Sequence, residues 1–89
     1  MTEKEKKIRE LEDQNAEWAK EILLNETAIY ETEKELSSID TELLSDQRIQ
    51  SNIQFLRLLI ERIESKNEIY KEIIYNNDLE INRLENEKD

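Results

Sequence analysis

The side chains best equipped for chemistry in this sequence are carboxylates, because the 89 residues include no histidine and no cysteine. Four glutamates recur at helical spacing: Glu61, Glu64, Glu68 and Glu72. Carboxylates suit Mg²⁺ or Ca²⁺ when loops organise them, but nothing in the chain resembles an EF-hand loop. We therefore interpret these glutamates as the solvated face of a helix, and we expect neither a metal site nor a cofactor.

Catalysis has little support in this composition. Serine, threonine, tyrosine and carboxylates are present, but there is no histidine to act as a base and no glycine to build an oxyanion loop or a phosphate-binding loop. Carboxylates with shifted pKa values need a pocket, and a narrow contact between helices does not provide one. We expect that the protein is not an enzyme and has no catalytic residues.

The apolar residues of the first half recur every seven positions, which predicts a coiled-coil helix. The two columns of this repeat are Ile8, Asn15, Ile22, Ile29, Leu36 and Leu43, and Leu11, Trp18, Asn25, Thr32 and Ile39. Thr2 and Glu5 begin the segment as a capping box, which satisfies backbone N–H groups of the first turn. Glycine and proline are absent from the chain, as expected for long helices.

The second half repeats the pattern in a different register. Its two columns are Ile53, Ile60, Asn67, Ile74 and Ile81, and Ile49, Leu56, Ile63, Tyr70, Asn77 and Leu84. Leu43 and Ile53 are ten residues apart, which is seven plus three. The helix therefore either ends between the two halves or continues through a stammer. We call the residues of all four columns the seam.

Folding the sequence about residue 46 places the two halves of the seam against each other, so that residue i meets residue 92 − i. Most of these pairs are apolar, but two join asparagines: Asn15 with Asn77, and Asn25 with Asn67. A buried asparagine needs a hydrogen-bond partner, and such residues often fix register and orientation. The asparagine pairs therefore predict antiparallel packing.

The distribution of charge favours the same orientation. The chain has a net charge of −10. Residues 21–47, which we call the acidic block, hold eight acidic residues and one basic residue, whereas residues 48–75 hold four acidic and five basic residues. A parallel dimer in register would place two acidic blocks side by side, while antiparallel packing separates them.

Two architectures satisfy antiparallel packing of a single domain over residues 1–89. In a helical hairpin, a first helix at about 3–44 and a second at about 49–87 are joined by a turn at about 45–48. In the alternative, the segment at 45–48 is a stammer, and one continuous long helix forms an antiparallel homodimer. Asp46 is a good N-cap for a second helix, whereas the absence of glycine favours the continuous helix. We favour the hairpin.

Apolar residues outside the seam predict contacts beyond one hairpin. Ordering costs roughly 1.5 kcal/mol per residue, and the core of a lone hairpin rarely offsets that cost. We therefore expect two hairpins to dimerise into a four-helix bundle, or one hairpin to dock on another helical protein. The predicted oligomer interface is every seam residue except Thr32. The predicted partner contacts outside the seam are Phe55, Leu59, Ile73 and Tyr75.

These features predict a non-enzymatic coiled-coil protein for oligomerisation or scaffolding, which acts through helix–helix contacts. An alternative is a small acidic regulatory binder or inhibitor that covers a basic or nucleic-acid-binding surface of its partner. A weaker alternative, by analogy of fold alone, is an RNA-associated bundle like Rop. Its basic face would consist of Arg57, Arg62, Lys66 and Lys71. The net charge of −10 opposes binding to nucleic acid.

The chain shows no sign of a membrane segment. No apolar run approaches the roughly 18 residues that a membrane span needs. Residues 1–7 lack the apolar stretch of a signal peptide. We therefore expect an intracellular, cytoplasmic protein.

Overall fold

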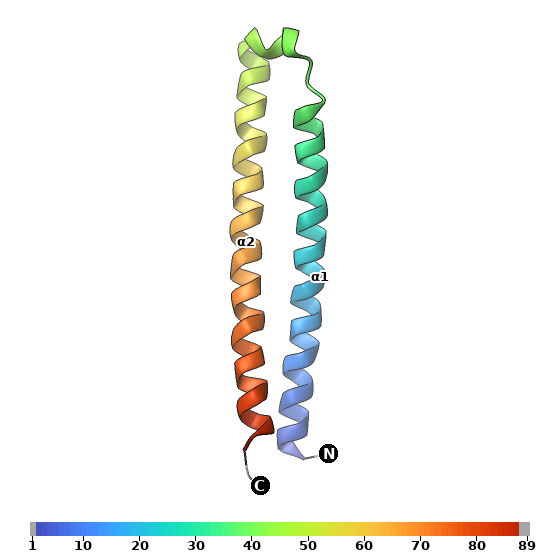
Figure 1. Ribbon diagram of the computed structural model, residues 1–89, viewed down its shortest axis with the longest axis vertical. Helices are drawn as coiled ribbons and strands as arrows, with labels where there is room; N and C mark the ends of the chain where they lie inside the picture. The colour runs from blue at the N-terminus through green and yellow to red at the C-terminus, as the bar shows by residue number, and fades with distance from the viewer. Residues whose placement is uncertain (1, 88–89) are drawn as a thin grey trace.

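The protein is an all-α hairpin of two long antiparallel helices (Figure 1). The computed structural model describes residues 2–87. Helix α1 spans Glu3–Ser37, a short 3₁₀ helix η1 spans Thr41–Ser45, and helix α2 spans Gln47–Glu85. The molecule measures 68 × 15 × 14 Å. The prediction of an antiparallel hairpin is confirmed, and the alternative of one continuous helix is wrong.

Side-chain caps define both ends of α1. Thr2 is the N-cap, and its hydroxyl accepts a hydrogen bond from the backbone N–H of Glu5 at 3.1 Å. At the other end, the hydroxyls of Ser37 and Ser38 donate to the carbonyl oxygens of Lys34 and Glu35, both at 2.8 Å. Serine competes in this way with the helical hydrogen-bond pattern. The first helix therefore ends at Ser37, and its predicted end near residue 44 is wrong.

The turn reverses the chain through two aspartates. Asp40 and Asp46 have extended backbone, with ψ angles of 130° and 124°. The carboxylate of Asp40 accepts from the N–H of Glu42 at 3.1 Å, and that of Asp46 accepts from the N–H of Arg48 at 2.8 Å. No residue in 2–87 has a positive φ angle, so this turn needs no glycine. Asp46 is the N-cap of α2, and the helix it begins runs over Gln47–Glu85, slightly offset from the predicted 49–87.

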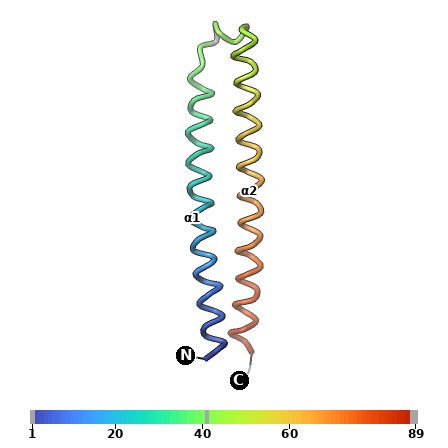
Figure 2. Tube along the Cα trace, turned by 180° about the vertical axis from the view of Figure 1, so that it is seen from behind, coloured from blue at the N-terminus to red at the C-terminus, as the bar shows by residue number. Residues whose placement is uncertain are grey.

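The core is a narrow line of contacts along the facing sides of α1 and α2. At the end that carries the chain termini, Leu11, Ile81 and Leu84 are buried, and Ile8 packs against them. These contacts agree with pairing about residue 46, because Ile8 then meets Leu84 and Leu11 meets Ile81. Figure 2 shows from the opposite side that the helices stay adjacent along their whole length.

The predicted interface residues are all buried or half-buried, with one exception. Leu43 is 49% exposed, so its prediction as a buried seam residue is wrong. The reason is the early end of α1 at Ser37. Leu43 lies in η1, where the seven-residue period of an α-helix no longer determines which way a side chain points.

Candidate interaction surface

The two predicted asparagine pairs form polar layers within the seam. The Asn25 side-chain amide donates to Oδ1 of Asn67 at 2.8 Å, and the Asn67 amide donates to the carbonyl oxygen of Ile22 at 3.4 Å. Nearer the termini, the Asn77 amide donates to Oδ1 of Asn15 at 2.9 Å. Both layers join α1 to α2 of one chain. The structure therefore uses the predicted interface residues for packing within the hairpin.

An aromatic stack lies between the two polar layers. The ring centroids of Trp18 and Tyr70 are 4.8 Å apart, with an interplanar angle of 27°. Strict pairing about residue 46 would place Trp18 opposite Ile74, four positions further along α2. The large rings reach the neighbouring layer and stack there, an arrangement that stabilises aromatic pairs beyond their burial. Both rings therefore belong to the hairpin core.

A second set of apolar side chains remains in water. Eleven large apolar residues are exposed within residues 2–87. They are Leu23, Leu24, Tyr30, Leu43, Leu44, Phe55, Leu58, Leu59, Ile69, Tyr75 and Leu79. Among the predicted partner contacts, Phe55 is 65% exposed and Tyr75 is 63% exposed, while Leu59 is 37% exposed and Ile73 is half-buried. Exposed apolar residues that lie together mark interaction surfaces.

Several of these residues lie together on α2. At 3.6 residues per turn, six positions of this helix fall within an arc of about 80° around its axis. The centre of this arc lies roughly 110° around the axis from the mean direction of the seam residues. We call them the α2 stripe: Phe55, Leu59, Arg62, Lys66, Ile69 and Ile73. Two basic residues occupy its centre, and two apolar residues lie on each side of them. The stripe has the i, i+4, i+7 spacing of a helix-packing face.

A small hollow opens at one end of the stripe. It has a volume of about 120 Å³ and is lined by Phe55, Leu58, Leu59 and Arg62. These residues are spaced i, i+3, i+4 and i+7. Four residues with this spacing form the hole that receives a side chain from a facing helix in knobs-into-holes packing.

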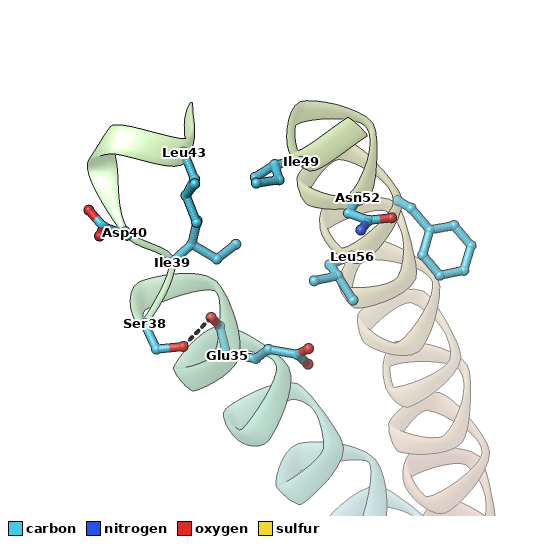
Figure 3. A pocket seen from close by; sticks show the side chains of 9 residues that line it. Glu35, Ser38, Ile39, Asp40, Leu43, Ile49, Asn52 and Leu56 are labelled. Atoms are coloured by element: carbon cyan, nitrogen blue, oxygen red, sulfur yellow. Dashed lines mark hydrogen bonds between the residues drawn. The ribbon is translucent and has the colours of Figure 1, made fainter. Parts of the chain in front are cut away.

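A larger open hollow of about 680 Å³ lies beside the turn (Figure 3). Ile39 and Leu43 line one side of it, and Ile49 and Leu56 line the other. The hollow forms because α1 ends at Ser37. Residues 38–40 therefore no longer continue the helix that packs against α2. The seven-residue repeat does not predict this hollow, although the Ser37–Ser38 pair is a signal for an early helix end. Phe55 lines this hollow as well as the smaller one.

The basic residues of α2 do not form one face. Arg57 and Lys71 lie on one flank of the helix, and Arg62 and Lys66 lie on another, about 140–180° away. An RNA backbone along α2 would contact only one of these pairs at a time. This placement removes the basic face on which the analogy with Rop depended.

The charged groups show ordinary helix chemistry. Arg83 Nε donates to Oε2 of Glu80 at 3.0 Å, and this hydrogen bond lowers the pKa of Glu80 and raises the pKa of Arg83. The residues are three positions apart on an exposed helix surface, as is common for helix ion pairs. The glutamates at 61, 64, 68 and 72 are exposed. Within residues 2–87, no group of three or more histidine, cysteine, aspartate or glutamate side chains is placed to hold a metal ion.

The fold and the surface together define a class of protein: an antiparallel helical hairpin with an exposed apolar face. Comparison of the chain with protein-family models, curated proteins and solved structures gave no significant match. Neither α1 nor α2 is long and apolar enough to cross a membrane.

Proposed function

We propose that the protein is a non-enzymatic oligomerisation or scaffolding module that acts through helix–helix contacts with other protein chains. The observation that carries this proposal is the α2 stripe. The hairpin already uses its seam internally, and yet Phe55 and Ile69 remain 65% and 56% exposed. Apolar residues that recur at helical spacing outside a completed seam are typical of a second packing face.

The thin core of the hairpin supports the same conclusion. Within residues 2–40 and 42–87, only five residues are buried: Leu11, Ile60, Asn67, Ile81 and Leu84. Small scaffolds of this kind rarely reach stability from their own core, and association is one common remedy. Covering the α2 stripe would remove additional apolar surface from water, at about 25 cal/mol per Å².

Sedimentation equilibrium over a range of concentrations tests this function. We expect the mass to reach twice 10.8 kDa as the concentration rises. We also expect the melting temperature to increase with concentration, because association stabilises the folded chain by mass action. A chain that stays monomeric at high micromolar concentration, and gains no helicity with helical partners, would contradict the proposal.

A second candidate is an acidic binder of basic protein surfaces. The observation that favours it is the exposure of Glu31, Glu33 and Glu35 in the acidic block. Binding to a lysine-rich protein should then weaken as salt rises, because salt screens exposed charges. Replacing these three glutamates by glutamine should abolish binding. The matched control is the same replacement at Glu61, Glu64 and Glu68, which should leave binding unchanged. Equal loss in both variants would indicate attraction by net charge alone.

A further inference from the structure

We propose that the α2 stripe binds the same stripe of a second copy of this chain, antiparallel and with the dyad at residue 64. This inference rests on the proposed function, and it names the surface and the partner. The smaller hollow, formed by Phe55, Leu58, Leu59 and Arg62, receives Ile69 of the second copy. By symmetry, Ile69 of the first copy enters the same hollow of the second.

The self-complementary pattern of the stripe supports this pairing. About residue 64, residue i of one copy meets residue 128 − i of the other. Phe55 then meets Ile73, and Leu59 meets Ile69. The register places all four apolar residues of the stripe against apolar residues. Moving the second copy by seven residues in either direction places apolar residues of the stripe against polar ones, so the dyad at residue 64 gives more apolar contacts than either of these two registers.

Polar residues that continue the stripe support the same register. Beyond the apolar pairs, Asn52 meets Asn76, so two amides lie opposite each other, as in the layers within the hairpin. One turn further, Arg48 meets Glu80, so opposite charges face each other at both ends of the contact. Parallel packing would instead place Arg48 beside Arg48 and Glu80 beside Glu80. Charge complementarity therefore selects the antiparallel orientation.

The position of the smaller hollow agrees with this register. Its four lining residues centre between Leu58 and Leu59, and the register places Ile69 or Tyr70 of the second copy at that level. Ile69 is 56% exposed on the stripe, whereas Tyr70 is stacked on Trp18 in the core. Ile69 is therefore the side chain available to fill the hollow, as a knob fills a hole.

The centre of the contact carries an unfavourable feature. Arg62 of each copy meets Lys66 of the other, so two like-charge pairs lie near the dyad. Their long aliphatic stems cover apolar neighbours while the charged ends reach water. Helix α1 at this level of the hairpin belongs to the acidic block, which offsets local positive charge. This repulsion provides a sharp test of the pairing. In the symmetric dimer, Arg62→Glu would replace both like-charge pairs by pairs of opposite charge.

The test compares dimer dissociation constants by sedimentation equilibrium. We expect Ile69→Gln to weaken the dimer about tenfold or more, because the lost apolar contact occurs twice. The matched control is Leu79→Gln on the same helix, since Leu79 is 51% exposed but lies away from the stripe. The control should change the constant by less than about twofold. Circular dichroism should show unchanged helix content in both variants.

A charge reversal completes the test. Arg62→Glu should tighten the dimer several-fold, and Arg62→Glu combined with Lys66→Glu should remove that gain because like charges meet again. Arg57→Glu, on the other flank of α2, is the control and should not tighten the dimer. If the native chain dimerises but neither Ile69→Gln nor Arg62→Glu changes its affinity, the stripe is not the interface and only the broader function stands. A native chain that does not dimerise overturns both.

Discussion

Among single residues, Asn67 is the buried polar residue of the seam: it is 4% exposed and hydrogen-bonded to both Asn25 and Ile22. Two buried amides that hydrogen-bond to each other lower the stability of the fold only slightly. A buried amide without a hydrogen-bond partner lowers it by the full desolvation energy of the group. A single apolar substitution and a paired one should therefore have different effects.

We expect Asn67→Ala to lower the free energy of unfolding by about 1–3 kcal/mol, because it leaves the amide of Asn25 without its partner. The double substitution Asn25→Leu and Asn67→Leu should be neutral or stabilising, with weaker control of register. Urea unfolding followed by circular dichroism measures both. Equal destabilisation by the single and double changes would contradict the hydrogen-bonded pair.

Glu80 provides a pH-dependent prediction at the same scale. The hydrogen bond from Arg83 lowers the pKa of Glu80 in the folded chain. Its contribution to stability is therefore complete above the ordinary pKa of a glutamate in the unfolded chain, and is lost as the pH falls through the lower folded pKa. We expect Glu80→Gln to reduce stability slightly at pH 7, and not at all below the folded pKa. An NMR titration of the Glu80 carboxyl that shows an ordinary or raised pKa would contradict this prediction.

At the scale of the elements, Asp46 decides where α2 begins. Its carboxylate caps a helix of 39 residues, whereas Asp40 caps only the five residues of η1. We expect Asp46→Ala to cost about 0.5–2 kcal/mol, as is usual for the loss of an N-cap. Asp40→Ala is the matched control and should cost clearly less. Thermal unfolding of the two variants measures the difference, and equal losses would show that α2 does not depend on its cap.

The elements also show how far periodicity predicts this fold. The seven-residue repeat predicted the helices, their antiparallel register and both asparagine layers, because each follows from which residues share one helix face. The end of α1 was not predicted, since Ile39 and Leu43 continue the repeat beyond the serines that stop the helix. Periodicity reports burial along a helix, but it does not report where side-chain hydrogen bonds replace helical ones.

Periodicity likewise predicts only part of the candidate surface. Exposure of Phe55 and Tyr75 could be predicted, because their positions fall outside the seam. Ile73 belongs to the same stripe as Phe55, but it is half-buried, which its position in the repeat did not predict. The large hollow beside the turn could not be predicted, because it results from the path of residues 38–46 after α1 ends. Turn paths depend on several weak local preferences that a repeat does not contain.

At the scale of the whole molecule, the dimension of the dimer tests the arrangement of the two copies. The single hairpin is 68 Å long. The middle of α2 is residue 66, so a dyad at residue 64 staggers the helices by four residues and adds about 6 Å at 1.5 Å per residue. Small-angle X-ray scattering of the dimer should therefore show twice the mass at almost the same length. A length near twice 68 Å would indicate association through the hairpin ends.

The termini lie together at one end of the molecule, opposite the turn (Figures 1 and 2). Nζ of Lys4 donates to the carbonyl oxygen of Glu87 at 2.7 Å, which joins the two ends directly. A mechanical load applied to the two ends would therefore pull the helices apart sideways, one layer after another, starting at the Ile8–Leu84 layer. Such peeling needs less force than sliding two helices past each other, because each layer resists alone. The hairpin would then act under tension as an extensible element that lengthens in small steps and closes again when released.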